Sequence, residues 1–187
     1  MDESAEIDVE ACKRCPVLVE SRRQIVNGVG PADADLLFVG EAPGEQEDRE
    51  GEPFVGRSGK LLDDVLGEHG LDRETVRITN SVKCRPPENR DPTGGELSNC
   101  RSHLEGEIRG VDPTAIVTLG KVPSEHLLDR SVAVTTEAGT TDEIAIGDST
   151  YRVLIGLHPA ATLYDPGTRE SFEAAIAAAA AMLGTER

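Results

Sequence analysis

The sequence has very little lysine, few aromatic residues and no long apolar run. Four of its 187 residues are lysine, 3% are aromatic, and none is tryptophan. No apolar stretch approaches the ~20 residues that a membrane-spanning helix needs. The first residues, Met1-Asp-Glu-Ser, lack the basic and apolar regions of a signal peptide. We therefore expect a cytoplasmic protein with no membrane partner.

Basic residues are outnumbered by acidic ones, so the formal net charge is −16 and the pI is about 4.6. An acidic excess normally argues against a nucleic-acid partner, which needs a positive footprint. Very high intracellular salt screens such repulsion, so we interpret the composition as the surface of a halophile's protein. Six of the 19 basic residues lie near the motifs: Arg57 with Lys60, and a group around Cys84 formed by Lys83, Arg85, Arg90 and Arg101.

The length suits one domain with a full-sized core, and no repeat or linker divides it. Short apolar runs predict buried strands at 36–39, 75–80, 114–119 and 151–157, with helical patterns between them. A weaker strand is predicted at 131–136, and 143–146 is predicted to form a hairpin with the last buried strand. Together these features predict a three-layer α/β/α sandwich with a central, mostly parallel four-stranded sheet.

The stretch 35–66 organises the chain. An apolar strand ends at Gly40, and a glycine- and proline-rich loop leads to a helix that begins near Ser58. A loop of this length in a compact domain is usually functional. It is not a phosphate-binding P-loop, because that spacing requires glycine at 54 and Ser or Thr at 61, where the chain has Phe54 and Leu61. Phe54 either offers a flat face to a planar ligand or plugs the end of the core.

The cysteines form one close pair and two dispersed positions. Cys12 and Cys15 have CxxC spacing, whereas Cys84 and Cys100 do not make a second short pair. This pattern favours a four-thiolate [4Fe–4S] site slightly over structural zinc, with a redox CxxC third. Cys100 falls on the apolar face of a predicted helix, as a buried ligand would.

Polar side chains follow two of the predicted strands. Asn80 ends one strand, and His158, followed by Pro159, ends another. In open α/β sheets, ligands bind at the carboxyl ends of the strands. The amide of Asn80 can offer one donor and one acceptor to a planar ligand, or it can simply cap the strand. A neutral His158 can stabilise a developing anion, or it can be a packed histidine at a strand end.

Four segments, in order along the chain, resemble the family 4 (thermostable-type, iron–sulfur) uracil-DNA glycosylases. They are Gly-Glu-Ala-Pro-Gly through Pro-Phe-Val-Gly-Arg-Ser-Gly at 40–59, Ile-Thr-Asn-Ser-Val-Lys-Cys-Arg-Pro-Pro at 78–87, Leu-Gly at 119–120 and His-Pro-Ala-Ala at 158–161. The resemblance runs from Cys12 to about Asp165. It implies a single uracil-DNA glycosylase-like domain over 1–187, with a [4Fe–4S] cluster held by the cysteines in 12–15 and 84–100.

The resemblance implies a role for each candidate residue. Phe54 stacks on an extruded uracil, Asn80 reads its edge, and His158 stabilises the anion that forms as the glycosidic bond breaks. Residues Glu41, Ala42 and Pro43 line the pocket. Since Ala42 stands where better-known uracil glycosylases have a water-positioning aspartate, Glu41 and Glu47 are the candidates to position the water.

DNA contacts are expected from Arg85 and Arg90. Leu163 either fills the space left by the flipped nucleotide or belongs to the core. The implied activity is hydrolysis of uracil from single- or double-stranded DNA, leaving an abasic site, by a monomer whose repair or replication partners the sequence does not name. The alternative is a catalytically silent iron–sulfur DNA-binding or sensor module on the same fold. A third possibility is an electron-transfer protein.

Overall fold

Five strands form the central sheet, in the order β2-β1-β3-β5-β4. A computed structural model describes residues 7–184. Four strands run parallel: β1 (Leu36–Gly40), β2 (Arg77–Asn80), β3 (Ala115–Leu119) and β5 (Ser149–Gly156). The fifth, β4 (Thr141–Ile146), pairs antiparallel with β5 at one edge. The sheet therefore has one strand more than the four predicted, because the hairpin strand predicted at 143–146 joins it at the edge as β4.

The weak strand predicted at 131–136 is also wrong. Residues Val134–Glu137 form the short helix α6 instead. The backbone of Ile155 in β5 is already bonded at its N–H to Thr140 and at its carbonyl to Gly139. Since the segment entering β4 occupies that edge of β5, residues 131–136 have no strand to pair with.

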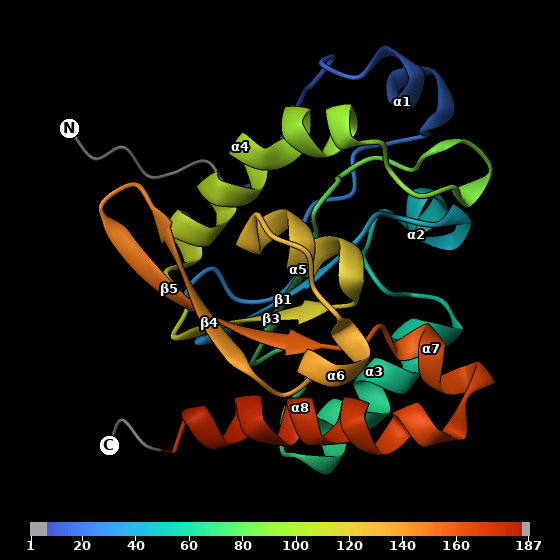
Figure 1. Cartoon of the computed structure of the whole chain (residues 1–187). Coiled ribbons are helices and arrows are strands. Elements are labelled where there is room, and N and C mark those ends of the chain that lie inside the picture. Colours follow the sequence, from blue (N-terminus) through green and yellow to red (C-terminus); the bar gives the residue numbers. More distant parts are fainter. Residues whose placement is uncertain (1–6, 185–187) are drawn as a thin grey trace.

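Helices cover both faces of the sheet and produce the predicted three layers (Figure 1). On one face, α3 (Arg57–Glu68) and α8 (Arg169–Met182) pack against Leu36 and Phe38. On the other face, α4 (Gly94–Val111) and α5 (Lys121–Leu128) pack against Leu37 and Val39. Successive residues of β1 thus serve opposite cores, as the pleat of a strand requires. Within residues 7–184, no helix is long and apolar enough to cross a membrane.

Short helices lie near the ends of the main strands and helices. They are α1 (Pro16–Ser21), α2 (Glu45–Glu50), α7 (Pro159–Tyr164) and the 3₁₀ turns at Pro87–Asn89 and Pro166–Thr168. The segment predicted as one long loop after β1 therefore contains α2. A one-sided cap helps to explain it, because the Glu47 carboxylate accepts a hydrogen bond from the backbone N–H of Gly44 at 3.1 Å.

The parallel strands end at one edge of the sheet. Gly40 of β1 lies in register with Asn80 of β2, and Leu119 of β3 lies in register with Gly156 of β5. His158 follows Gly156 by two residues and begins α7 as its N-cap. This register brings segments far apart in the sequence to the same edge, where the site lies.

Candidate active site

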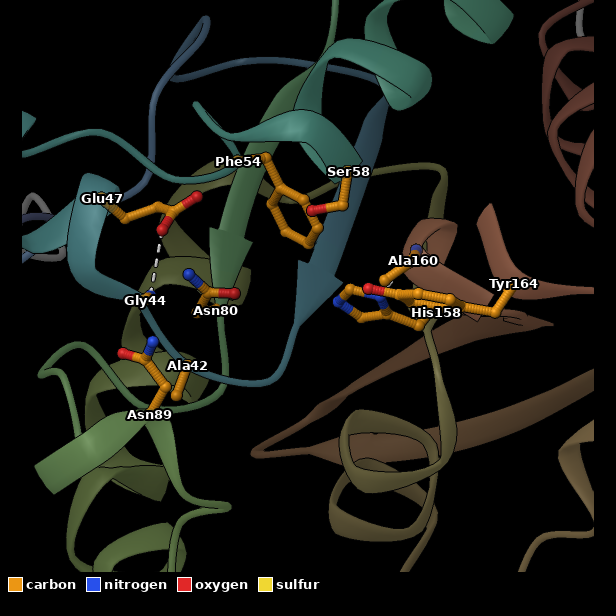
Figure 2. A pocket seen from close by; sticks show the side chains of 10 residues that line it. All are labelled: Ala42, Gly44, Glu47, Phe54, Ser58, Asn80, Asn89, His158, Ala160 and Tyr164. Carbon is orange, nitrogen blue, oxygen red and sulfur yellow. Dashed lines mark hydrogen bonds between the residues drawn. The ribbon is translucent and has the colours of Figure 1, made fainter. Parts of the chain in front are cut away.

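A cavity of about 610 Å³ opens at the carboxyl edge of the sheet. Figure 2 shows Phe54, Asn80 and His158 around it, with Asn89 and Tyr164 on opposite sides. Four different segments supply its walls: the loop after β1, the first turn of α3, the segment that follows β2, and α7. The lining residues are Ala42, Gly44, Glu47, Phe54, Ser58, Asn80, Asn89, His158, Ala160 and Tyr164.

Gly40 lets the side chains of Asn80 and Phe54 approach each other at the floor of this cavity. A Cβ atom at position 40 would lie 2.5 Å from Oδ1 of Asn80 and 2.5 Å from Cζ of Phe54. Real Cβ atoms do not approach other atoms so closely, so any larger residue displaces one of the two side chains. The glycine that ends the strand therefore sets the spacing between the aromatic ring and the amide.

Phe54 is held in a strained backbone conformation with φ of 54°. Its ring is buried at 6% exposure, and its centroid lies 5.8 Å from that of the His158 ring, with 33° between the planes. The guanidinium of Arg73 donates to the carbonyl of Pro53 at 2.8 Å and to the carbonyl of Phe54. Arg73 thus fixes the turn that a non-glycine residue rarely adopts.

Glu47 ties the two ends of the loop together. Its carboxylate accepts hydrogen bonds from the backbone N–H groups of Gly44, Val55 and Gly56 at 3.1, 3.2 and 3.3 Å. An ionised carboxylate has about four acceptor positions. Because three are used by the loop, one remains for a water molecule or ligand in the cavity that Glu47 lines.

His158 presents one nitrogen to the cavity. Its Nδ1 accepts a hydrogen bond from the backbone N–H of Ala160 at 3.0 Å. Burial lowers the pKa of His158, and the opposing attraction of Glu47 is the smaller effect. The ring is therefore neutral near pH 7, with Nδ1 unprotonated and the proton on Nε2. This tautomer is a hydrogen-bond donor aimed at whatever the cavity holds.

Glu41 occupies a different place from Glu47. Among the described residues it does not line the cavity. Its carboxyl group faces Asp91 on the segment after the 3₁₀ turn Pro87–Asn89, and burial, with Asp91 as a second cause, raises the pKa of Glu41 to about 7. Of the other predicted pocket residues, Ala42 lines the cavity, whereas Pro43 is buried beside it.

The predicted cluster of cations is largely neutralised within the protein. Arg85 donates to Asn89 at 2.7 Å and lies 3.8 Å from Glu45. Arg90 makes two hydrogen bonds to the carboxylate of Glu96, at 2.9 and 2.8 Å. Two further cations have partners of their own: Lys83 is buried against Glu107, and Arg101 pairs with Glu105.

Leu163 is not part of the core, since 38% of it is exposed. Sequence reasoning did not select five residues that line the cavity: Gly44, Ser58, Asn89, Ala160 and Tyr164. Tyr164 had a usable signal, because it is one of only two tyrosines in the chain and lies six residues after His158.

The cysteines lie together, away from the cavity. Cys12, Cys15, Cys84 and Cys100 line one small apolar recess with Leu18 and Val82, and none forms a disulfide. The guanidinium of Arg22 donates to Sγ of Cys84 at 2.9 Å and to the carbonyl of Cys12 at 2.8 Å. Burial raises the pKa of the Cys84 and Cys100 thiols, which Arg22 and Lys83, respectively, oppose.

All four cysteines of the chain line this one recess. Across residues 7–184, no three His, Cys, Asp or Glu side chains are grouped to hold one metal ion. A [4Fe–4S] cluster binds each thiolate to a different iron, so its four sulfurs surround a larger body rather than one point. An apolar recess lined by four cysteines, with an Arg donor on one sulfur, is the kind of site that such a cluster would occupy.

The fold and the cavity together define an α/β protein with a strand-end pocket for a planar, hydrogen-bonding ligand. Residues 27–180 match the family described as the uracil DNA glycosylase superfamily, and the chain belongs to that superfamily. Relatives carrying the name Type-4 uracil-DNA glycosylase confirm the family 4 resemblance. The protein from Archaeoglobus fulgidus is 39% identical, with 89% of this chain and 85% of that protein aligned.

Two further Type-4 uracil-DNA glycosylases agree. The protein from Sulfurisphaera tokodaii is 41% identical over 89% of this chain and 77% of its own length. The protein from Thermotoga maritima is 44% identical over 70% of this chain and 68% of its own length. The three alignments together place most of the chain, including the strand ends that form the cavity, within one family.

Proposed function

We propose that this chain removes uracil from DNA by hydrolysing its N-glycosidic bond, which leaves an abasic site for repair. The observation that carries the proposal is the convergence of Phe54, Asn80 and His158 on one cavity, in a member of the uracil DNA glycosylase superfamily. Relatives covering most of the chain carry the name of that activity. A silent DNA-binding module would not need a neutral histidine donor in the pocket.

The pocket has the parts that recognition of a flipped base requires. The face of Phe54 stacks on the uracil ring, which is taken out of the helix to reach the cavity. The Asn80 amide donates to O4 and accepts from N3–H. Cytosine presents the opposite pattern at these two positions and leaves both ends of the amide unpaired, which costs binding free energy.

His158 acts on the charge that develops. When the bond between C1′ and N1 breaks, its electron pair passes to uracil, and the negative charge spreads to O2. The Nε2–H of His158 donates to that oxygen and stabilises the transition state more than the ground state. Water adds its oxygen to C1′, and the proton it loses neutralises the departing uracil.

Glu47 rather than Glu41 positions the water. Glu47 lines the cavity and retains one acceptor position, whereas Glu41 faces Asp91. The same carboxylate holds the loop that carries Phe54, because it binds the backbone of Val55 and Gly56. Glu47 therefore orients both the nucleophile and the stacking surface.

The DNA strand on either side of the uracil contacts the rim. Leu163 is exposed next to the cavity wall and fills the space that the flipped nucleotide leaves. Arg85 and Arg90 contact phosphates by exchanging their present partners, Glu45 and Glu96. The protein acts on single- or double-stranded DNA as a monomer.

The four cysteines hold a [4Fe–4S] cluster. Such a cluster supplies a rigid crosslink between α1, α4 and the segment that follows β2, with no part in the glycosidic step. Arg22 stabilises the site by donating to Cys84 and by fixing the backbone of Cys12. Because Cys84 directly precedes Arg85, an ordered cysteine site also orders one proposed phosphate contact.

An alkaline cleavage assay tests the proposal. The protein is mixed with a labelled oligonucleotide containing one uracil, and the products are heated in alkali, which breaks the strand at abasic sites. We expect one break at the uracil, and none in the matched oligonucleotide with thymine. Intact strands with tight DNA binding would instead support the silent binding module.

A further inference from the structure

Large apolar side chains are almost all buried, with a clear exception at the rim of the cavity. Among residues 7–184 the exposed ones are Val17, Leu163 and Tyr164, at 52%, 38% and 85% exposure. Two of the three are neighbours at the end of α7. Tyr164 also lines the cavity, and in Figure 2 its side chain extends from α7 toward the cavity. One aromatic ring is therefore both part of the wall and open to solvent.

The position of this ring is fixed by the helix that carries His158. His158 caps the start of α7, and Tyr164 is the last residue of the same helix. Inside it, the hydroxyl of the buried Thr162 donates to the carbonyl of Pro159 at 2.8 Å, and the backbone N–H of Asp165 closes the final turn on Ala161. The backbone of Tyr164 is therefore held on the same short helix as the proposed catalytic residue, and its exposed ring lines the same cavity.

Because this protein is strongly acidic, a contact with DNA that does not depend on charge would help binding. The net charge is −16, and the two arginines expected to meet phosphates are engaged by Glu45 and Glu96. Attraction to phosphates also weakens as salt rises, whereas stacking of a base on an aromatic ring does not depend on charge. Tyrosine suits this position, since it supplies a large flat surface at little conformational cost.

We propose that Tyr164 forms a base-stacking subsite, on which the base next to the extruded uracil packs. The inference rests on the proposed function, because it assumes DNA whose uracil occupies the cavity. It assigns the ring a neighbouring base rather than the uracil itself, which stacks on Phe54. Leu163 occupies the vacated position in the strand, and Tyr164 holds the adjacent base in place.

Fluorescent DNA tests this subsite. The probe is an oligonucleotide with a non-hydrolysable deoxyuridine analogue and 2-aminopurine on its 5′ or 3′ side, in single- and double-stranded form. We expect Tyr164→Ala to weaken binding by about 5- to 150-fold, the loss typical of one base–aromatic stack. Tyr164→Phe should bind normally. The weakening caused by Tyr164→Ala should be the same in low and high salt.

The fluorescence identifies the stacked base. Wild type should quench 2-aminopurine on one side of the uracil analogue, and Tyr164→Ala should lose that quenching. Val17→Ala is the matched control, since Val17 is exposed but lies among residues of another surface hollow. Equal affinity and equal quenching in wild type and Tyr164→Ala would overturn the subsite. If the alkaline assay shows no uracil excision, the proposed function fails, and that result does not depend on Tyr164.

Discussion

The ring of Phe54 and the imidazole of His158 face the same cavity with their centroids 5.8 Å apart and their planes inclined by 33°. In the proposed complex, a base stacked on the phenyl ring presents its O2 edge to the imidazole. The Nδ1 atom of His158 is occupied by Ala160, so the nitrogen left for that edge is Nε2. This arrangement joins ground-state stacking and transition-state donation in one site.

The first prediction concerns Arg73, which holds Phe54. We expect Arg73→Ala to lower uracil excision by up to roughly 10²-fold, the cost of a misplacement of about 1 Å at a reacting centre. Arg73→Lys should not restore activity, because one ammonium cannot replace the guanidinium fork at two carbonyls. Single-turnover rates measure the effect on excision, and thermal unfolding measures the effect on stability.

The control for Arg73 is Asp63→Asn. Asp63 pairs with Arg73 at 2.7 Å but does not touch the Phe54 turn. Asp63→Asn should therefore stay near wild-type activity. If it matched Arg73→Ala, the ion pair rather than the carbonyl contacts would hold the loop.

The second prediction concerns base choice at Asn80. Asn80→Asp replaces the amide donor with a carboxylate oxygen, which suits the N4 amino group of cytosine better than O4 of uracil. Uracil excision should fall, and cytosine excision should rise relative to it. Asn80→Ala should lose uracil excision without gaining any on cytosine. Wild-type uracil activity in Asn80→Ala would show that this side chain does not read the base.

The third prediction concerns pH and Glu41. The pKa of this carboxyl group is about 7 in the folded protein, against an ordinary value of 4.5. Between these two pH values the folded protein keeps a proton that the unfolded chain releases, so raising the pH removes stability. We expect the melting temperature of Glu41→Gln, measured relative to that of wild type, to increase as the pH rises from 4.5 to 8.

The control for Glu41 is Glu50→Gln, an exposed carboxylate at the end of α2. If the melting temperature of Glu41→Gln, relative to wild type, changed with pH no more than that of Glu50→Gln, then burial and Asp91 would not hold Glu41 in its protonated form.

The fourth prediction concerns the cysteines. Purified protein should be brown and contain iron and inorganic sulfide, and Cys84→Ala should lose both together with DNA affinity. Arg22→Gln should keep the iron but lower the reduction potential, because a hydrogen bond to a ligand sulfur stabilises the more negative, reduced cluster. Arg23→Gln is the control, since Arg23 bonds the carboxylate of Asp48 through its backbone N–H. Colourless protein with stoichiometric zinc would contradict the cluster.

Local patterns predicted the parts of this protein that depend on short sequence segments. The buried strand before Gly40 was evident from its apolar run, and the inward position of Cys100 from its helical spacing. Asn80 and His158 could be expected at one edge because parallel strands end there. The stretch around Phe54 resembles a known family closely enough to predict that this loop binds a base.

Contacts between distant segments escaped the same reasoning. Arg73 reaches Phe54 across 19 residues, and Arg22 reaches Cys84 across 62, so no local pattern links either pair. The cations near Cys84 resembled a DNA-binding surface because the sequence does not show that Glu45 and Glu96 face them. Strand β4 begins at Thr141, two residues before the predicted strand at 143–146, because backbone pairing with β5 rather than an apolar pattern sets its start.

The central claim is that His158 stabilises the uracil anion in the transition state. The most direct measurement compares wild type with His158→Ala for single-turnover release of uracil and for affinity toward DNA with a non-hydrolysable uracil analogue, in high salt. We expect the rate to fall about 10²–10³-fold while affinity and fold remain near normal. A full single-turnover rate in His158→Ala would contradict the account and leave the chemistry to Glu47.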